Sequence, residues 1–241
     1  MQLPLDNYPN PDILVDSDWL QEHIDDPNVR IVDCDPIDAF KRAHIRGAVG
    51  IPVHHYIKHP DYASDPNKYP LVAKGSVVKD LMESMGIGDD SLVVVYDSGG
   101  SLWATRFWWV LNHYGHQEVK VLDGGWNKWY DEGRSISTAP SSKKVVDFTP
   151  DIIDYRVCYI DEALSKIGDD ATLFLDVRSD REWEGTNSRG NLRSGRIPGA
   201  VHLEWLNFVS NDKYQTFKSA EELTALVKSV GVTPDKDIIT Y

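Results

Sequence analysis

Five arginines lie in one short stretch of a chain that is otherwise strongly acidic. The 241 residues carry a formal net charge of -13. The basic stretch contains Arg178, Arg181, Arg189, Arg193 and Arg196. Guanidinium groups hold oxyanions through paired hydrogen bonds, and positive charge focused on an acidic protein steers small anions toward it. The stretch is therefore either an anion-binding rim or a solvated loop whose charge is balanced by neighbouring acidic residues.

The two cysteines are the other residues that invite a chemical interpretation. Cys34 follows the end of an expected strand, but its place in the repeat described below differs from that of the functional loop. Cys158 lies just before an expected helix. We expect both to be packed, inert thiols. Because they lie in different halves of the chain, they provide no disulfide framework.

Three histidines, His54, His55 and His59, are close enough in sequence to resemble a metal site. Without a Cys or carboxylate partner at a useful spacing, they are better explained as part of a loop that covers the domain. The sequence therefore predicts no metal site.

One supersecondary pattern occurs twice and defines where a functional residue belongs. In the first copy, the apolar run 92–96 is followed by Asp97-Ser98-Gly99-Gly100. In the second copy, the corresponding run ends at Tyr241, where the sequence stops. Since Tyr96 and Tyr241 match at a constant offset, the counterpart of Asp97 would be the residue immediately after Tyr241.

Alternating strands and helices position these residues in both copies. In the first copy, strands are expected at 29–33, 92–96 and 119–122. In the second copy, they are expected at 172–176 and 238–241. In the first copy, one helix is expected to begin at Asp16 or Ser17, two are expected at 77–85 and 106–111, and a fourth is expected to run through Trp129. In the second copy, helices are expected at 160–167 and 220–230. Such alternation predicts an α/β fold with a parallel sheet covered on both faces. A polar, Pro-containing stretch separates the copies, so we predict domains at 1–136 and 157–241 joined by a linker at 137–156.

Composition excludes several classes of function. Binding to a nucleic-acid backbone requires a basic face, which a net charge of -13 opposes. No apolar run approaches the ~20 residues that a membrane span needs, and the N-terminus lacks the pattern of a signal peptide. We therefore expect a cytoplasmic protein with neither a nucleic-acid nor a membrane partner.

The repeated motifs resemble the rhodanese family, specifically the tandem-domain thiosulfate and mercaptopyruvate sulfurtransferases. The resemblance rests on Leu175-Asp176-Val177-Arg178, on the run 195–201 (Gly-Arg-Ile-Pro-Gly-Ala-Val) and on the run 122–126 (Leu-Asp-Gly-Gly-Trp). The sequence departs from the usual Gly-His-Ile-Pro-Gly-Ala at Arg196, a position that is usually structural. The match covers the whole chain and implies two rhodanese-like domains, of which the second is incomplete.

The resemblance also implies how the activity is divided between the copies. The first domain would be catalytically silent, because Asp97 stands where a nucleophile is needed and a carboxylate cannot carry a sulfane sulfur. The second domain would be catalytic, with a Cys expected immediately after Tyr241. The implied reaction moves sulfane sulfur from thiosulfate to cyanide or a thiol acceptor through a Cys-persulfide, without any cofactor. The 241-residue chain as given is then expected to be inactive.

The choice of sulfur donor depends on the arginine-rich loop. By resemblance, Arg189 falls where mercaptopyruvate sulfurtransferases place one substrate arginine, whereas Glu182 falls where they place another. This departure favours thiosulfate over mercaptopyruvate, although Arg181 or Arg193 could compensate for the missing arginine. Arg178 is expected to form an internal salt bridge, and Asp176 to order its loop by accepting backbone hydrogen bonds. The alternatives to thiosulfate transfer are mercaptopyruvate as donor, a silent tandem module acting in binding or regulation, and phosphatase or arsenate reductase chemistry.

Overall fold

The computed structural model describes residues 8–51, 72–142 and 144–241. The chain divides into two compact units. The first, here called the N-terminal unit, comprises Asn10–Asp154 and Asn211–Thr216. The second, the C-terminal unit, comprises Tyr155–Ser210, Phe217–Tyr241 and the start of the chain up to Pro9. Histidines 54, 55 and 59 lie outside the described residues.

The N-terminal unit is built on a parallel sheet whose strands are apolar and buried. Among the described residues, the strand order is β1-β6-β5-β2-β4. The strands are β1 (Leu14–Val15), β2 (Val29–Asp33), β4 (Val49–Gly50), β5 (Leu92–Tyr96) and β6 (Val119–Leu122). Every pairing in this sheet is parallel. The strands expected at 29–33, 92–96 and 119–122 are therefore confirmed. A separate antiparallel pair joins β3 (His44–Ile45) to β7 (Ile136–Ser137).

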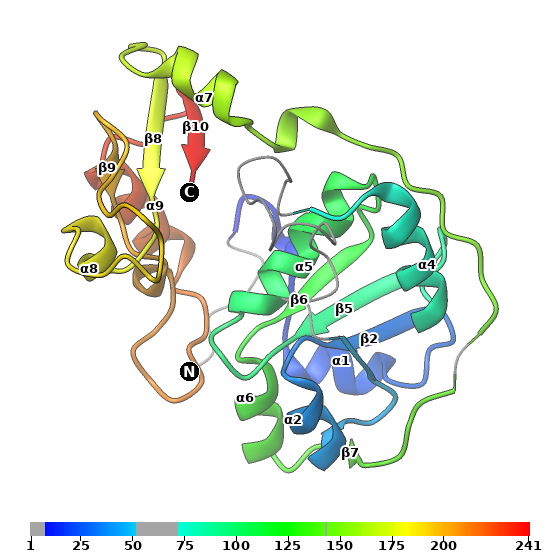
Figure 1. The fold of residues 1–241 in the computed structure, drawn as a ribbon. Coiled ribbons are helices and arrows are strands. Elements are labelled where there is room, and N and C mark those ends of the chain that lie inside the picture. Colours follow the sequence, from blue (N-terminus) through cyan, green and yellow to red (C-terminus); the bar gives the residue numbers. More distant parts are fainter. Residues whose placement is uncertain (1–7, 52–71, 143) are drawn as a thin grey trace. The chain divides into compact units, whose positions relative to one another are not determined.

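Helices cover both faces of this sheet (Figure 1). They are α1 (Ser17–His23), α2 (Ile37–Arg42), α4 (Gly75–Met85), α5 (Leu102–His113) and α6 (Gly125–Asp131), with a 3-10 turn η2 (Pro11–Ile13) before β1. On one face, Leu20 of α1 and Trp129 of α6 are fully buried against Val94 and Tyr96. Side chains alternate along a strand, so Val93 and Val95 point to the other face. Helices α4 and α5 cover that face (Figure 1).

Capping residues set the ends of these helices. The Asp16 carboxylate accepts a hydrogen bond from Trp19 N at 2.8 Å, which satisfies a free N–H in the first turn of α1. At the other end of α4, Gly86 adopts φ +72° and donates its N–H to the carbonyls of Glu83 and Met82. This left-handed conformation favours glycine and turns the chain toward β5.

The C-terminal unit has a smaller parallel sheet. Its strand order among the described residues is β10-β8-β9, with β8 (Thr172–Asp176), β9 (Val201–His202) and β10 (Asp237–Thr240). Helices α7 (Ile160–Lys166), α8 (Asp180–Trp183) and α9 (Ala220–Ser229) accompany the strands, with 3-10 turns η3 (Asp154–Arg156) and η4 (Trp205–Phe208). This alternation confirms the α/β class expected for the second copy.

The core of the C-terminal unit is small. Leu173, Leu175 and Leu203 are its buried cluster, and the side chains packed around them are only partly buried. Helix α7 buries none of its residues, and Leu164 on that helix is 61% exposed. None of the described helices is long and apolar enough to cross a bilayer.

Candidate functional site at the strand ends

A bidentate ion pair fixes the loop that follows β8. Arg178 Nε lies 2.9 Å from Asp176 Oδ1, and Nη2 lies 2.5 Å from Oδ2. The backbone N of Arg178 also donates to Asp176 Oδ1, at 3.0 Å. The Asp176 side chain is fully buried, so the paired guanidinium satisfies a carboxylate that water cannot reach. The expected internal salt bridge and the loop-ordering role of Asp176 are both confirmed.

Tyr241 is held in the same network. Its hydroxyl accepts a hydrogen bond from Ile197 N at 3.0 Å and is also bonded to Asp176. The Arg178 guanidinium carbon lies 5.1 Å from the centre of the Tyr241 ring. Arg178 further donates to Gly195 O at 2.8 Å. The side chain that follows strand β10 is therefore held by contacts with Ile197, Asp176 and Arg178.

The same contacts set the electrostatics of this network. Burial raises the pKa of Asp176, but hydrogen bonds from Arg178 and Tyr241 outweigh it, and the pKa lies below its ordinary value. The Arg178 pKa is raised, chiefly by its hydrogen bond to Asp176. Asp176 is therefore a permanently charged structural group near neutral pH, not a proton donor.

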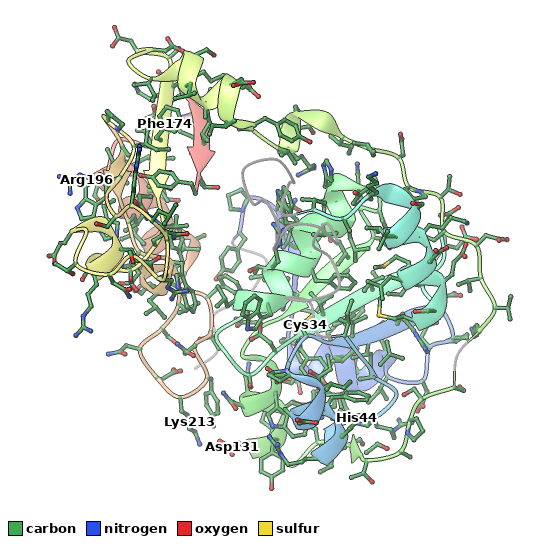
Figure 2. The ribbon with its side chains drawn as sticks, in the orientation of Figure 1. Cys34, His44, Asp131, Phe174, Arg196 and Lys213 are labelled. Carbon is green, nitrogen blue, oxygen red and sulfur yellow. The ribbon has the colours of Figure 1, made fainter. Side chains whose placement is uncertain are left out.

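Arg196 stacks on an aromatic side chain instead of facing the loop end. Its guanidinium carbon lies 4.1 Å from the Trp183 ring centre, and Nη1 donates to Trp183 O at 3.1 Å. On Trp183, the His202 ring stacks at 4.9 Å with an interplanar angle of 7°. Figure 2 marks Arg196 in the C-terminal unit. Cation–π stacking of this kind is a structural role, in keeping with the departure from His in the motif.

The three candidate substrate arginines lie on the loop side of β8, and all are exposed. Arg181 lies on α8, where its carbonyl accepts hydrogen bonds from Thr186 N and Asn187 N. Arg189 adopts φ +48°, and its Nε lies 3.3 Å from Glu182 Oε2. Arg193 makes no hydrogen bond or ion pair among the residues that the structure describes. The structure thus places Arg189 beside α8, the helix that carries Arg181, but shows no contact that brings Arg193 to them.

Glu182 has a structural role that explains its presence in place of an arginine. Its Oε2 accepts the Ser179 hydroxyl at 2.7 Å and faces Ser179 N, while Ser179 caps the first turn of α8. This reciprocal arrangement is a capping box. The pattern Ser-x-x-Glu could have indicated it from sequence. Glu182 therefore starts the helix and also holds Arg189.

The N-terminal unit repeats the tyrosine network at the end of β5. Tyr96 donates its hydroxyl to Asp33 Oδ2 at 2.6 Å and accepts from Ile45 N at 3.0 Å. Among the residues that the structure describes, no arginine pairs with Asp33. Burial instead raises the pKa of Asp33 to about 7, despite the hydrogen bond from Tyr96. Burial also raises the pKa of Asp35, whose Oδ1 accepts from Ser98 N and the Ser98 hydroxyl.

Asp97 fills the loop that follows β5 with its own carboxylate. Oδ1 accepts from Gly99 N at 2.8 Å and Ser101 N at 2.9 Å. Oδ2 accepts from Trp103 N at 2.7 Å and Ala104 N at 2.8 Å. Converging backbone N–H groups before a helix form an anion-binding nest. In this copy the Asp97 carboxylate is itself the anion that the nest binds.

Neither cysteine is placed for chemistry. Cys34 is 3% exposed, and burial together with Asp97, Asp33 and Asp35 raises its pKa well above the ordinary value. Figure 2 marks it within the N-terminal unit. Burial, with a smaller effect of Glu162, raises the pKa of Cys158 as well. A thiol with a raised pKa is a poor nucleophile. Cys34 is the packed thiol that the sequence predicts, whereas Cys158 is only partly buried. In the described part of the chain, no group of three potential metal ligands comes together.

Comparison with known proteins gives the family of the two copies. The model of the rhodanese-like domain matches residues 16–132 and again residues 159–241. The sulfur carrier protein TtuD of Thermus thermophilus is 36% identical, over 97% of this chain and 83% of that protein. A putative thiosulfate sulfurtransferase of Mycobacterium bovis is 32% identical, over 95% of this chain and 82% of that protein.

A solved structure agrees with these sequence matches. The crystal structure of SseA from Escherichia coli, described as a 3-mercaptopyruvate sulfotransferase, superimposes with a TM-score of 0.81 at 26% identity. The match covers 95% of this chain and 87% of that one. Two matched domains, two strand ends with the same tyrosine network and relatives that share this architecture lead to one conclusion. The chain belongs to the rhodanese family of sulfurtransferases, with two rhodanese-like domains in tandem.

Proposed function

We propose that this chain carries the donor-binding part of a sulfurtransferase that moves sulfane sulfur from thiosulfate to cyanide or a thiol acceptor. The proposed nucleophile is a Cys immediately after Tyr241. The observation that supports this most directly is the shared tyrosine network. Tyr241 is fixed by Ile197 and Asp176 as Tyr96 is fixed by Ile45 and Asp33. The residue after Tyr96 sits in a nest of four N–H groups, so the residue after Tyr241 would enter an equivalent nest.

Such a nest supplies what sulfur transfer needs. A free thiol with a pKa of ~8.5 is mostly protonated at neutral pH, and N–H donors stabilise its thiolate. The thiolate attacks the outer sulfur of thiosulfate, the S–S bond breaks, and sulfite leaves with the electron pair. The Cys-persulfide then gives its terminal sulfur to cyanide, and thiocyanate leaves as the thiolate is restored. Two half-reactions through one covalent intermediate predict ping-pong kinetics, and neither step requires a metal or an organic cofactor.

The arginine-rich loop would bind the anionic end of the donor. Arg181, Arg189 and Arg193 are exposed on the loop side of β8, where guanidinium groups can meet an oxyanion from solvent. Glu182 holds Arg189 at 3.3 Å and so restricts the positions that this guanidinium can take. Arg178 is already engaged by Asp176 and serves the loop's geometry instead.

Mercaptopyruvate is a second candidate donor, because the superimposable SseA structure is described as acting on it. Its carboxylate could use the same arginines. A silent module acting in binding or regulation is the other alternative, favoured by the occupied nest at Asp97 in the first copy. We place the reaction in the cytoplasm, where thiol acceptors are reduced.

Thiocyanate formation from thiosulfate and cyanide tests the proposal. The parent gene should encode Cys at the next codon, and its full-length product should be active, whereas residues 1–241 should give no turnover. A matched full-length variant with Ser at that codon should lose activity while keeping its fold. Asp or Ser in the natural gene, or measurable activity in residues 1–241, would overturn the proposed nucleophile. A higher kcat/KM with mercaptopyruvate than with thiosulfate would overturn the proposed donor alone.

A further inference from the structure

Residues 185–196 of the C-terminal unit form a surface loop whose two ends lie close together. A Cβ on Gly185 would lie 3.5 Å from Ser194 Oγ and 3.7 Å from the backbone N of Gly195. Residues 190–196 are all exposed. Surface loops of this length with adjacent ends are Ω-loops, which are frequently functional. The contacts that keep loop 185–196 closed therefore decide how its arginines are presented to solvent.

Loop 185–196 itself contains no carboxylate that could neutralise its arginines. Between Glu184 and Glu204 the sequence has no aspartate or glutamate, whereas it has Arg189, Arg193 and Arg196. Like charges at close range repel one another, and this repulsion favours an open loop. A closed loop therefore needs contacts that outweigh the repulsion.

Helix α8 supplies such contacts through three successive residues. The carbonyl of Arg181 accepts hydrogen bonds from two backbone N–H groups at the start of the loop. Glu182 contacts Arg189 near the middle of the loop, and Trp183 contacts Arg196 at its end. The start, the middle and the end of the loop are thus each bound to one residue of the same short helix.

Two contacts restrain the second half of the loop. Arg178 donates to Gly195 O at 2.8 Å, and Arg196 stacks on the Trp183 ring at 4.1 Å while donating Nη1 to the Trp183 carbonyl at 3.1 Å. The Arg178 side chain also neutralises the buried Asp176, so changing it would disturb the strand end. Arg196 is exposed, and its stack is therefore the restraint that can be removed by itself.

The positions of the two candidate donor-binding arginines in this loop depend on these restraints. The Arg189 side chain is 69% exposed, and a single ion pair in such surroundings contributes little, so its contact with Glu182 is weak. Within the described part of the chain, Arg193 has no hydrogen-bond or ion-pair partner, so its place is set by the backbone. Because three residues span at most about 11 Å, a fixed Arg196 confines the backbone of Arg193.

The indole on which Arg196 stacks is itself held in place. The His202 ring stacks on Trp183 at 4.9 Å, and its Nε2 donates to Arg178 O at 2.9 Å. Within α8, Trp183 N donates to Ser179 O at 3.0 Å. Strand β9 and the helix together thus fix the ring, which gives the guanidinium a rigid surface for cation–π stacking.

We propose that Trp183 and Arg196 are positioning residues for binding of the sulfur donor. Their stack holds loop 185–196 closed and so presents Arg189 and Arg193 in a fixed arrangement. A loop that is fixed before binding loses less conformational entropy when an anion arrives, so the anion binds more tightly. Arginine at position 196, where the motif usually has histidine, supplies a group that stacks and donates at the same time. Because this loop is the proposed donor site, the positioning role rests on the proposed function.

Steady-state thiocyanate formation by the full-length protein tests the positioning role. Arg196→Gln should raise the KM for thiosulfate about fivefold to tenfold, because it removes a cation–π contact and a charge-assisted hydrogen bond. It should leave kcat and the KM for cyanide within about twofold, since the loop acts on donor binding alone. Arg196→Lys keeps a cation over the ring and should restore most of the affinity. Arg156→Gln is the matched control, because Arg156 stacks on Tyr155 outside the loop and should leave both KM values unchanged.

Thiosulfate binding to residues 1–241 gives a readout that does not need the proposed nucleophile. Calorimetric titration, with sodium chloride at equal ionic strength as the reference, should show a Kd about fivefold to tenfold higher in Arg196→Gln than in the parent chain. An unchanged thiosulfate KM or Kd in Arg196→Gln, or an equal change in Arg156→Gln, would overturn the positioning role. No binding to the parent chain would overturn it together with the donor site. An inactive full-length parent would instead overturn the proposed sulfur transfer, and the titration would still decide the positioning role.

Discussion

The two copies hold the tyrosine at the strand end through the same hydrogen bonds, but the aspartate bonded to each tyrosine has a different electrostatic environment. In the C-terminal unit, Arg178 forms a bidentate pair with Asp176 and lowers the proton affinity of that carboxylate. In the N-terminal unit, the position corresponding to Arg178 is Asp35, and the buried Asp33 has a pKa of about 7. In the C-terminal unit, pairing with a cation therefore keeps the carboxylate charged. In the N-terminal unit, the carboxylate lacks that cation and is close to protonation at neutral pH.

This difference determines whether a further negative charge is favourable at each strand end. In the N-terminal unit, burial raises the pKa of the Cys34 thiol, and the charges of Asp97, Asp33 and Asp35 raise it further. A second anion is unfavourable near such a cluster. In the C-terminal unit, Arg178 and the exposed arginines supply positive charge around the loop after β8. The same backbone frame thus carries a group of carboxylates at the strand end of one copy and a group of arginines at the strand end of the other.

The largest expected effect comes from removing the carboxylate that occupies the N–H nest of the first copy. Replacing Asp97 with Ala removes the acceptor for four backbone N–H groups, all at 2.7–2.9 Å. Because the carboxylate is buried and each bond is charge-assisted, the N-terminal unit should lose about 3–5 kcal/mol of unfolding free energy. Urea denaturation followed by tryptophan fluorescence measures the loss, since Trp129 is buried in this unit.

Asp90→Ala is the matched control for that experiment. Asp90 is exposed on the turn before β5, so its replacement should change the unfolding free energy by less than about 0.5 kcal/mol. A loss below about 1 kcal/mol in Asp97→Ala would mean that the nest does not depend on its internal anion. Other contacts would then hold the loop after β5 in place.

The next effect is the opposite response of the two aspartates to pH. The pKa of Asp33 is about 7 in the folded protein and about 3.9 in an unfolded chain. Between these values the folded state binds the extra proton, so this group makes stability fall as pH rises from 4 to 7, by about 3 kcal/mol. Asp176 has a lowered pKa, so its contribution is present above pH 4 and is lost only as pH falls further.

Replacing Asp33 with Asn isolates this contribution. Asparagine keeps an oxygen for Asp35 N, which bonds to Asp33 at 2.9 Å, but it does not titrate. Urea midpoints measured from pH 4.5 to 7.5 should therefore decline less steeply in Asp33→Asn than in the parent chain. Asp38→Asn, on the exposed side of α2, should keep the parent slope. An unchanged slope in Asp33→Asn would show that this copy, too, keeps its aspartate charged.

The sequence predicted the elements that carry a strong apolar pattern. Strands β2, β5, β6 and β8 lie at the expected residues, because each is a continuous buried run ended by a polar loop. The family followed from motifs repeated in order. By contrast, the short strands β3 and β7 pair residues far apart in sequence through only two residues each, and no local pattern specifies such pairing.

The site was predicted less completely, because its key contacts depend on geometry. The salt bridge of Arg178 follows from its spacing to Asp176, but the four N–H groups around Asp97 converge only after the loop closes. Among the contacts that the sequence analysis did not predict, the capping role of Glu182 is the one that a local motif, Ser-x-x-Glu, could have indicated.

The smallest expected effect comes from removing the cap of α8, so that this helix begins without a side-chain cap, as its counterpart in the first copy does. Helix α8 begins with the Ser179–Glu182 capping box, whereas its counterpart α2 begins after Pro36 with no side-chain cap. Glu182→Ala should therefore cost about 1 kcal/mol, the usual effect of losing a cap, and should also release Arg189 from its 3.3 Å contact. Glu182→Gln keeps an acceptor oxygen and should cost about half as much, while Glu184→Ala, at an exposed position, is the matched control. Urea unfolding of the C-terminal unit measures the difference, which should be smaller than that of Asp97→Ala because a half-exposed helix start can recruit water to its free N–H groups. A cost in Glu182→Ala equal to that of Glu184→Ala would mean that α8, like α2, forms without help from its first-turn side chains.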